Sequence, residues 1–283
     1  MTVLESIQKS AGFLTSKAVE SPRLQAELLL AHLLKLPRMQ LYLNFERCLA
    51  PLEQGELREL IRRRGRREPL QHIIGSTSFC GCEIAVDRRV LIPRPETELL
   101  AETGWRHLST LSPQPSTALD FGTGSGCIAI ALAVKCPGVR VFAADISAEA
   151  LSVARQNAAA HHVEDRIDFV GGDGFAALPG DIRFDLIIGN PPYIPSAEIA
   201  SLQPEVRDFD PRLALDGGAD GLDFYRRLAV EARPFLKANG RLLLEFGDGQ
   251  TDAVREILRH ENWIVEAVRE DYNRCPRMVI ATI

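Results

Sequence analysis

The chain has 283 residues, 46% of them hydrophobic and 25% charged, and its net charge is −5 at pH 7. This balance is typical of a globular protein with a real core, and the length allows one large domain plus a small one. The acidic balance argues against a protein whose main task is to wrap duplex DNA or RNA, because such proteins usually carry a basic surface.

The N-terminal sequence MTVLESIQKSAGFL lacks the basic start and apolar core of a signal peptide. No apolar stretch approaches the roughly 20 residues that are needed to span a bilayer. We therefore expect a cytoplasmic protein with no membrane partner.

Residues 1–70 carry apolar side chains at helical spacing, as in SPRLQAELLLAHLLKL, and strand-like alternation is absent there. Ser21 and Pro22 have the residue types of a helix cap and a first helical turn. This pattern predicts a small helical N-terminal domain. The dense basic run at residues 62–67 has two interpretations, a solvated helix end or a docking patch for an acidic partner or ribosomal RNA.

Residues 71–93 consist of short apolar runs separated by glycine and polar pairs, which predicts a β-hairpin linker. From residue 94 to residue 283, buried-looking strands alternate with helical patterns. This order indicates an α/β domain with a Rossmann-like, mostly parallel sheet. The last two apolar runs, 263–271 and 276–283, are joined by a short turn, so one late strand should run antiparallel to the others.

Six cysteines are scattered along the chain, and only Cys80 and Cys82 lie close together. Two sulfur ligands without a second pair make a poor metal site. We expect reduced thiols, no disulfide and no metal.

A glycine-rich turn, GTGSG at residues 122–126, follows the first strand of the predicted sheet. Such glycines let a ligand lie against bare backbone at the N-terminus of a helix. The next strand ends in Asp145, about 20 residues further on, where an acid conventionally accepts hydrogen bonds from ribose hydroxyls. A nucleoside-bearing cofactor is therefore favoured over a merely structural turn.

The identity of that cofactor depends on the details of the turn. Its glycine spacing is tighter than the GxGxxG of dinucleotide folds, and Asp120 stands at its head. A carboxylate at that position would repel a pyrophosphate but could help to organise a site for a cationic amine. S-adenosyl-L-methionine carries an ammonium, a carboxylate and a sulfonium, so it suits the turn better than NAD does.

The third strand ends in Asp173, Gly174 and Phe175, at the edge of the sheet where ligands of open α/β folds bind. Asp173 could accept a hydrogen bond from an adenine amino group, and Phe175 could cover the adenine ring. The alternative makes Asp173 a turn residue and Phe175 a core residue.

The fourth strand stops at Asn190, Pro191, Pro192 and Tyr193. An amide NH2 group needs two acceptors to be held in place, and the Asn190 side-chain oxygen and the Pro191 carbonyl offer them. Tyr193 offers a flat surface for a planar group. The motif predicts a grip on a planar –C–NH2 group that orients its nitrogen toward a sulfonium methyl. The alternative is a proline-rich turn with an incidental asparagine.

The turn at 122–126, together with Asp145 and the Asn-Pro-Pro-Tyr motif, resembles the class I S-adenosylmethionine-dependent methyltransferases that methylate amino groups. Three further stretches, residues 68–75, 91–98 and 205–218, look like the peptide chain release factor N5-glutamine methyltransferases of the HemK type. The resemblance covers nearly the whole chain. It implies methylation of the glutamine side chain in the GGQ motif of bacterial release factors, and a helical N-terminal domain that recognises the substrate.

The resemblance also implies a role for each matching residue. The expected cofactor-binding residues are Gly122, Thr123, Gly124, Ser125, Gly126, Asp145, Asp173, Gly174, Phe175 and Asn190. Asn190, Pro191 and Tyr193 are expected to be catalytic. The expected substrate-binding residues are Asn190, Pro191, Pro192, Tyr193, Arg94 and Glu96.

Three other functions compete with this one. A nucleic-acid amino methyltransferase is disfavoured by the acidity of the chain, and a non-catalytic nucleoside-binding scaffold would not need Asn190. An NAD-binding oxidoreductase is disfavoured by the spacing of the glycines. We expect release factors as partners, no direct nucleic-acid contact and, because no segment shows sustained heptads, a monomer.

Overall fold

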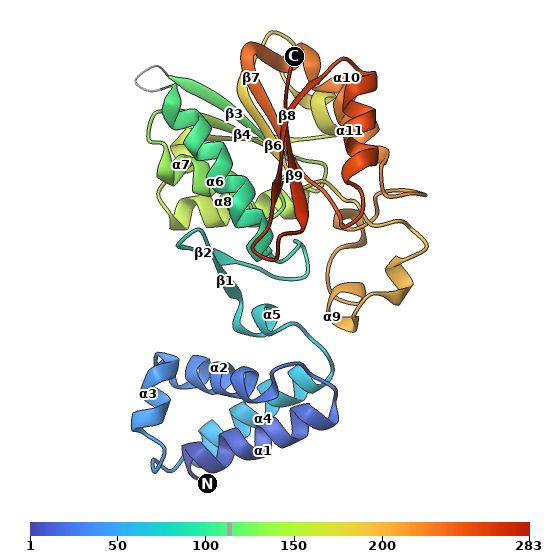
Figure 1. Cartoon of the computed structure of the whole chain (residues 1–283). Helices are drawn as coiled ribbons and strands as arrows, with labels where there is room; N and C mark the ends of the chain where they lie inside the picture. The colour runs from blue at the N-terminus through green and yellow to red at the C-terminus, as the bar shows by residue number, and fades with distance from the viewer. Residues whose placement is uncertain (112–114) are drawn as a thin grey trace. The chain divides into compact units, whose positions relative to one another are not determined.

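The computed structural model describes residues 1–111 and 115–283, and residues 112–114 of the expected third domain lie outside it. The chain divides into two compact units (Figure 1). One contains residues 1–76 together with residues 203–209, and the other contains residues 77–202 and 210–283. The helical unit thus includes residues 71–76 and a distant short segment, both of which lie outside the range 1–70 expected from the sequence.

The first unit is helical. It contains α1 (Val3–Ser16), α2 (Pro22–Leu34), α3 (Arg38–Leu43), α4 (Pro51–Gly65), α5 (Leu70–Ile74) and α9 (Pro204–Arg207). Thr2 begins α1 through a capping box with Glu5, in which each side chain accepts the other residue's N–H. Pro22 opens α2 as predicted, but the Ser21 side chain makes no cap hydrogen bond because its backbone is left-handed, with a φ of 47°.

Much of the basic run at residues 62–67 is paired within this unit. Arg64 is only 3% exposed and donates to Glu205 at 2.7 Å, and Arg67 donates to both Glu205 carboxylate oxygens at 2.6 Å. These pairs fasten residues 203–209 to the end of α4. If this run forms a docking patch, the residues that can contact a partner are therefore Arg62 and Arg66, whose side chains are exposed.

Helix α5 occupies the start of the segment that was expected to be a hairpin. Ile73 packs into the helical core, so residues 71–74 gain more from helical packing than from strand pairing. Gly75, with a φ of 90°, ends the helix. The hairpin itself is shorter, with β1 (Ser76–Phe79), β2 (Cys82–Ala85) and a two-residue turn in which both residues have positive φ.

The second unit is built on a seven-stranded sheet. Its strands are β3 (Ser116–Phe121), β4 (Val139–Asp145), β5 (Ile167–Gly171), β6 (Phe184–Gly189), β7 (Leu236–Glu245), β8 (Ile264–Glu270) and β9 (Pro276–Thr282). They lie in the order β5-β4-β3-β6-β7-β9-β8. The pairs formed among β5, β4, β3, β6 and β7 are parallel, and β9 is antiparallel to both of its neighbours, β7 and β8, which confirms the mostly parallel sheet with one reversed strand.

Helices cover both faces of this sheet (Figure 1). One face carries α6 (Pro95–Thr110), α7 (Cys127–Lys135) and α8 (Ala148–Ala160), and the other carries α10 (Asp223–Glu231) and α11 (Thr251–His260). Because side chains alternate along a strand, Leu186 and Ile188 of β6 join the first layer and Ile187 joins the second. Both faces are apolar, as expected for buried parallel strands.

Short 3₁₀ turns complete the structure at Glu164–Arg166, Gly174–Ala177, Ile199–Ser201, Arg212–Ala214 and Arg233–Phe235. Within the ranges 1–111 and 115–283, no helix combines the length and the apolar character needed to cross a membrane.

The ion pairs around Glu205 give a prediction about stability. Glu205→Ala leaves the buried Arg64 guanidinium without its carboxylate, so the free energy of unfolding of the helical unit should fall by about 3–5 kcal/mol. Unfolding in guanidinium chloride, followed by far-ultraviolet circular dichroism, measures this loss of stability. Tryptophan fluorescence reports the other unit alone, because Trp105 and Trp263 both lie there.

The matched control is Arg62→Ala, which removes an exposed pair with Glu59 and should leave the unfolding curve almost unchanged. Equal unfolding curves for the two variants would contradict a structural role for the pairs around Glu205.

Candidate functional site

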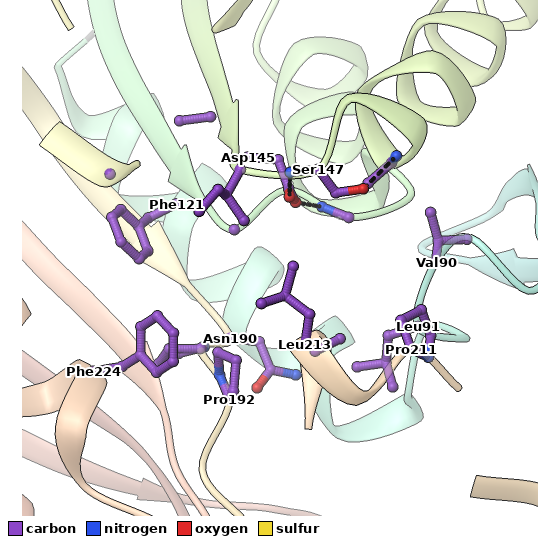
Figure 2. Close-up of a pocket in the computed structure, with 18 of the residues that line it drawn as sticks. Val90, Leu91, Phe121, Asp145, Ser147, Asn190, Pro192, Pro211, Leu213 and Phe224 are labelled. Carbon is purple, nitrogen blue, oxygen red and sulfur yellow. Dashed lines mark hydrogen bonds between the residues drawn. The ribbon is translucent and has the colours of Figure 1, made fainter. Parts of the chain in front are cut away.

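The loops that follow β3, β4, β5 and β6 line a single pocket at the carboxyl edge of the sheet (Figure 2). The chain order reverses between the neighbouring strands β3 and β6, which is where open α/β sheets bind ligands. The pocket brings together these residues from the sequence predictions: Gly122, Gly124, Asp145, Asp173, Gly174, Asn190, Pro191 and Pro192.

The glycine turn presents bare backbone to this pocket. Gly122 and Gly124 have φ values of 72° and 54°; a Cβ atom on Gly122 would meet nothing within 4 Å, and one on Gly124 would meet the Gly122 carbonyl oxygen at 4.0 Å. Gly126 has a different role, because its Cβ would lie 3.0 Å from the Cβ of Ala154. It lets α7 pack closely against α8 and does not line the pocket.

Asp120 stabilises the glycine turn through hydrogen bonds. The carboxylate is fully buried, and its Oδ2 accepts hydrogen bonds from the Thr123 hydroxyl at 2.6 Å and the Ala129 N–H at 3.1 Å. Burial raises the pKa of Asp120 to about 7, although these hydrogen bonds oppose the rise. Thr123 and Ser125 are buried as well, so both support the turn and neither lines the pocket.

Asp145 has a carboxylate that the backbone holds in place. Oδ2 accepts the N–H of Gly124 at 2.8 Å, and Oδ1 accepts the N–H of Ser147 at 2.9 Å (Figure 2). A carboxylate has about four lone-pair positions, so acceptor capacity remains for a ligand hydroxyl. Burial raises the pKa of Asp145, while the backbone hydrogen bonds favour its ionised form.

Asp173 lines the pocket but is already paired. Arg227 of α10 donates to its carboxylate and also to its carbonyl oxygen, and Arg227 itself lines the pocket. A Cβ at Gly174 would lie 2.6 Å from Nη2 of Arg227, so glycine at this position makes room for the pair.

Phe175 occupies the core, which is the second of the two alternatives considered for it. It is 3% exposed, and its ring stacks on Phe121 with a centroid distance of 5.3 Å. Phe121 and Phe224 are the aromatic side chains that reach the pocket (Figure 2). Phe175 packs against Phe121 within the core, and almost none of its side chain is exposed for a ligand to contact.

Asn190 meets the pocket at the end of β6. Its Nδ2 donates to the hydroxyl oxygen of Thr97 on α6 at 3.2 Å. The Glu245 carboxyl lies at the end of β7, and hydrogen bonding with the Thr97 and Asn190 side chains favours its ionised form. Thr97 and Glu245 are each 3% exposed, so this small polar network lies inside the apolar interior.

Pro191 and Pro192 line the pocket beside Asn190. In the part of the chain that the structure describes, no group donates a hydrogen bond to the Pro191 carbonyl. Since a proline has no N–H and a fixed φ, the strand ends here and leaves that acceptor unused.

Tyr193 does not line the pocket. It is half-buried against the core of the α10–α11 face, and its Cδ2 lies 2.9 Å from the position of a Cβ on Gly247. The Tyr193 carbonyl accepts a hydrogen bond from Gln250 at 2.9 Å. Burial raises the pKa of Tyr193 to about 12, so the phenol stays neutral.

Arg94 and Glu96 also lie outside the pocket lining. Arg94 donates to the buried Asp210 at 2.6 Å and thereby anchors the residue before Pro211, which forms part of the pocket wall. Glu96 lines a separate small cavity with Glu245 and Arg277.

Several lining residues were missed in the sequence analysis: Arg89, Val90, Leu91, Pro211, Leu213, Ala214, Phe224 and Arg227. A signal existed for some of them, because residues 91–98 and 205–218 stood out as motifs. Phe224 and Arg227 belong to no motif, and only the packing of α10 against the sheet brings them to the pocket.

The pocket fits S-adenosyl-L-methionine. Its bare backbone at Gly122 and Gly124 leaves room for an aliphatic chain, the Asp145 carboxylate has free acceptor positions, and the ring of Phe121 offers an apolar face. These are the groups that a ligand with a cationic chain, a ribose and a planar base requires.

Known proteins resemble this chain along most of its length. Residues 5–75 match the family described as PrmC N-terminal domain, and residues 101–202 match the Methyltransferase small domain family. A protein of Geobacter sulfurreducens is 42% identical over 98% of this chain and 95% of its own length. A protein of Chlorobaculum tepidum is 45% identical over 98% and 95%. Both carry the name release factor glutamine methyltransferase.

The fold also occurs among solved structures. A methyltransferase from Pyrococcus furiosus is 18% identical and aligns with a TM-score of 0.53, covering 78% of this chain and 98% of its own. At this identity the likeness concerns the fold alone.

The glycine turn gives a prediction about cofactor affinity. Gly124→Ala places a methyl group in the open space of the pocket, at a φ of 54° that alanine adopts only with strain. The Kd for S-adenosyl-L-methionine, measured by titration calorimetry, should rise at least about tenfold, which corresponds to about 1.4 kcal/mol.

Gly138→Ala is the matched control, because Gly138 is exposed and also has open space around its Cβ position. Equal affinities for the two variants would show that the cofactor does not lie against the turn.

Proposed function

This chain belongs to the release factor glutamine methyltransferase family, and we propose that Asn190 and Pro191 grip the glutamine amide that it methylates. It is a methyltransferase that uses S-adenosyl-L-methionine. We take the substrate to be the glutamine of the GGQ motif in bacterial peptide chain release factors. The observation that carries the proposal is an asparagine amide and an unused proline carbonyl side by side in the lining of one pocket.

The chemistry of the substrate explains the need for such a grip. An amide nitrogen is a poor nucleophile, because its lone pair is delocalised into the carbonyl group. S-adenosyl-L-methionine supplies a methyl group on a positively charged sulfur. With one N–H on the Asn190 side-chain oxygen and the other on the Pro191 carbonyl, the nitrogen is oriented and its developing positive charge is stabilised. When the glutamine nitrogen takes the methyl group, the S–C bond breaks and its electron pair stays on the sulfur as a neutral thioether, while the nitrogen releases one proton.

The remaining predicted residues have supporting roles in this proposal. Gly122, Gly124 and Asp145 would hold the cofactor directly, and Asp173 with Gly174 would border its base. The predicted residues that do not line the pocket would act indirectly, through packing, hydrogen bonds or ion pairs: Thr123, Ser125, Gly126, Phe175, Tyr193, Arg94 and Glu96.

The test of the proposal is methyl transfer by Asn190→Ala. With radiolabelled S-adenosyl-L-methionine, the unmodified chain should label release factor, and it should label neither duplex DNA nor ribosomal RNA. Asn190→Ala should lower kcat by about a hundredfold or more, since one of the two acceptors is lost. Its Kd for the cofactor should change little.

Asn239→Ala is the matched control, because Asn239 is exposed and does not line the pocket. A release factor whose GGQ glutamine is replaced by alanine should take up no label. Normal turnover by Asn190→Ala would overturn the proposed grip.

We also propose that the helical N-terminal unit recognises the release factor as a whole protein. Arg62 and Arg66 are the exposed members of the basic run; Arg62 pairs with Glu59 at the surface, and both side chains are accessible to an acidic partner. Reversing both, as Arg62→Glu with Arg66→Glu, should raise KM for intact release factor and leave KM for a short GGQ peptide unchanged.

Arg259→Glu makes the same kind of charge change at an exposed position of α11 and should alter neither value. Equal losses on the intact factor and on the peptide would refute recognition by this basic run. Because release factors act at the ribosome, the proposed substrate implies a cytoplasmic location, and we propose a monomer that does not bind nucleic acid directly.

A further inference from the structure

We infer that Glu245, acting through Thr97, fixes which end of the Asn190 amide faces the substrate. Glu245 belongs to none of the motifs that the sequence analysis singled out. This inference rests on the proposed grip, because it concerns how Asn190 comes to present an acceptor to the pocket.

The argument starts from the symmetry of an asparagine side chain. Its oxygen and its NH2 group have nearly the same size, so packing alone does not decide which of them faces a given neighbour. The grip works only when the oxygen faces the substrate NH2. In the opposite orientation two NH2 groups would face each other, and neither would find an acceptor.

Thr97 alone cannot select the orientation. The Asn190 Nδ2 donates to the Thr97 hydroxyl oxygen at 3.2 Å, but a hydroxyl can donate as well as accept. It would tolerate either end of the amide by rotating its own proton.

Glu245 removes this freedom. An ionised carboxylate only accepts hydrogen bonds, so the Thr97 hydroxyl must donate to it and the NH2 group of Asn190 must turn toward it. The oxygen of Asn190 is then left for the substrate. The glutamate is 3% exposed, and its Oε2 has no partner among the described residues, so the carboxyl has acceptor capacity for both the Thr97 hydroxyl and the Asn190 NH2 group.

The backbone holds this carboxyl in place. Glu245 is the last residue of β7, and its carbonyl accepts a hydrogen bond from the fully buried Tyr225 hydroxyl at 2.9 Å. Charged and polar groups from four surrounding elements influence the ionisation of this carboxyl: Glu96 and Thr97 on α6, Asn190 and Tyr193 after β6, Tyr225 on α10, and Arg277 on β9. Two residues of β8, Arg269 and Glu270, line the same small cavity as Glu245.

The ionisation of Glu245 then matters for activity. Burial raises the pKa of Glu245 to about 7, while the hydrogen bonds with Thr97 and Asn190 lower it. Below that pH the protonated carboxyl can donate, and Asn190 gains the freedom to turn its NH2 group outward. Activity that depends on the orientation should therefore fall as the pH drops through about 7 and should be full above it.

The test compares kcat of the full chain between about pH 5.5 and pH 9 for the unmodified protein and for Glu245→Gln. Glutamine fills the same volume but has an NH2 group that can donate. At high pH its kcat should be at least about tenfold lower, and the decline of kcat toward low pH should disappear. Its Kd for S-adenosyl-L-methionine should be unchanged, whereas a merely structural role would lower stability and cofactor affinity together.

Thr97→Ser and Thr97→Val provide a second, matched pair. The serine keeps the hydroxyl and should retain nearly full kcat, while the similarly shaped valine should lose it to about the same extent as Glu245→Gln. In Asn190→Ala, adding Glu245→Gln should cause no further loss, because the glutamate acts through the asparagine.

Full kcat and an unchanged pH profile in Glu245→Gln would overturn the inference. Equal kcat in Thr97→Ser and Thr97→Val would overturn it as well. The Thr97 comparison tests the inference even if Glu245→Gln fails to fold. An inactive Asn190→Ala beside a fully active Glu245→Gln would refute this inference and leave the proposed function standing. An active Asn190→Ala would refute the proposed function itself.

Discussion

Two hydrogen-bond acceptors can hold a substrate amide only where the protein leaves them unused, and the end of β6 meets this condition. Inside a sheet the backbone carbonyls accept hydrogen bonds from neighbouring strands, and a buried acceptor without a partner is costly. At Pro191 and Pro192 the ladder must stop, since neither residue has an N–H. The Pro191 carbonyl thus becomes free at the edge where the parallel strands end, next to the Asn190 side chain.

The rest of the second unit positions the loops at this edge of the sheet. The order of the strands places the turn after β3 and the loop after β6 side by side, so that a cofactor against one would lie near a substrate on the other. Buried acids give these loops their rigidity. Asp120 ties the glycine turn to α7, and Glu245 with Thr97 fixes the asparagine from behind. Neither acid lines the pocket, yet each holds a residue or loop that does.

The sequence predicts the sheet well because hydrophobic alternation and glycine turns are local signals, as in β6 and residues 122–126. It also predicts the residues whose backbone or side chain must meet the pocket, such as Gly124, Asp145 and Asn190. It fails where packing between distant segments decides. Phe175 turns into the core because Phe121 and Phe235 surround it, and α5 forms because Ile73 is buried by other helices. No local pattern announces that Glu245 meets Thr97, because the two are far apart in the chain.

The measurement that bears most directly on the central claim is a crystal structure of the chain with S-adenosylhomocysteine and a peptide that contains the GGQ sequence. The glutamine side-chain nitrogen should lie about 2.7–3.2 Å from both the Asn190 Oδ1 and the Pro191 carbonyl oxygen. Glutamine bound elsewhere in the pocket, or an Asn190 oxygen that points toward Glu245, would contradict the account.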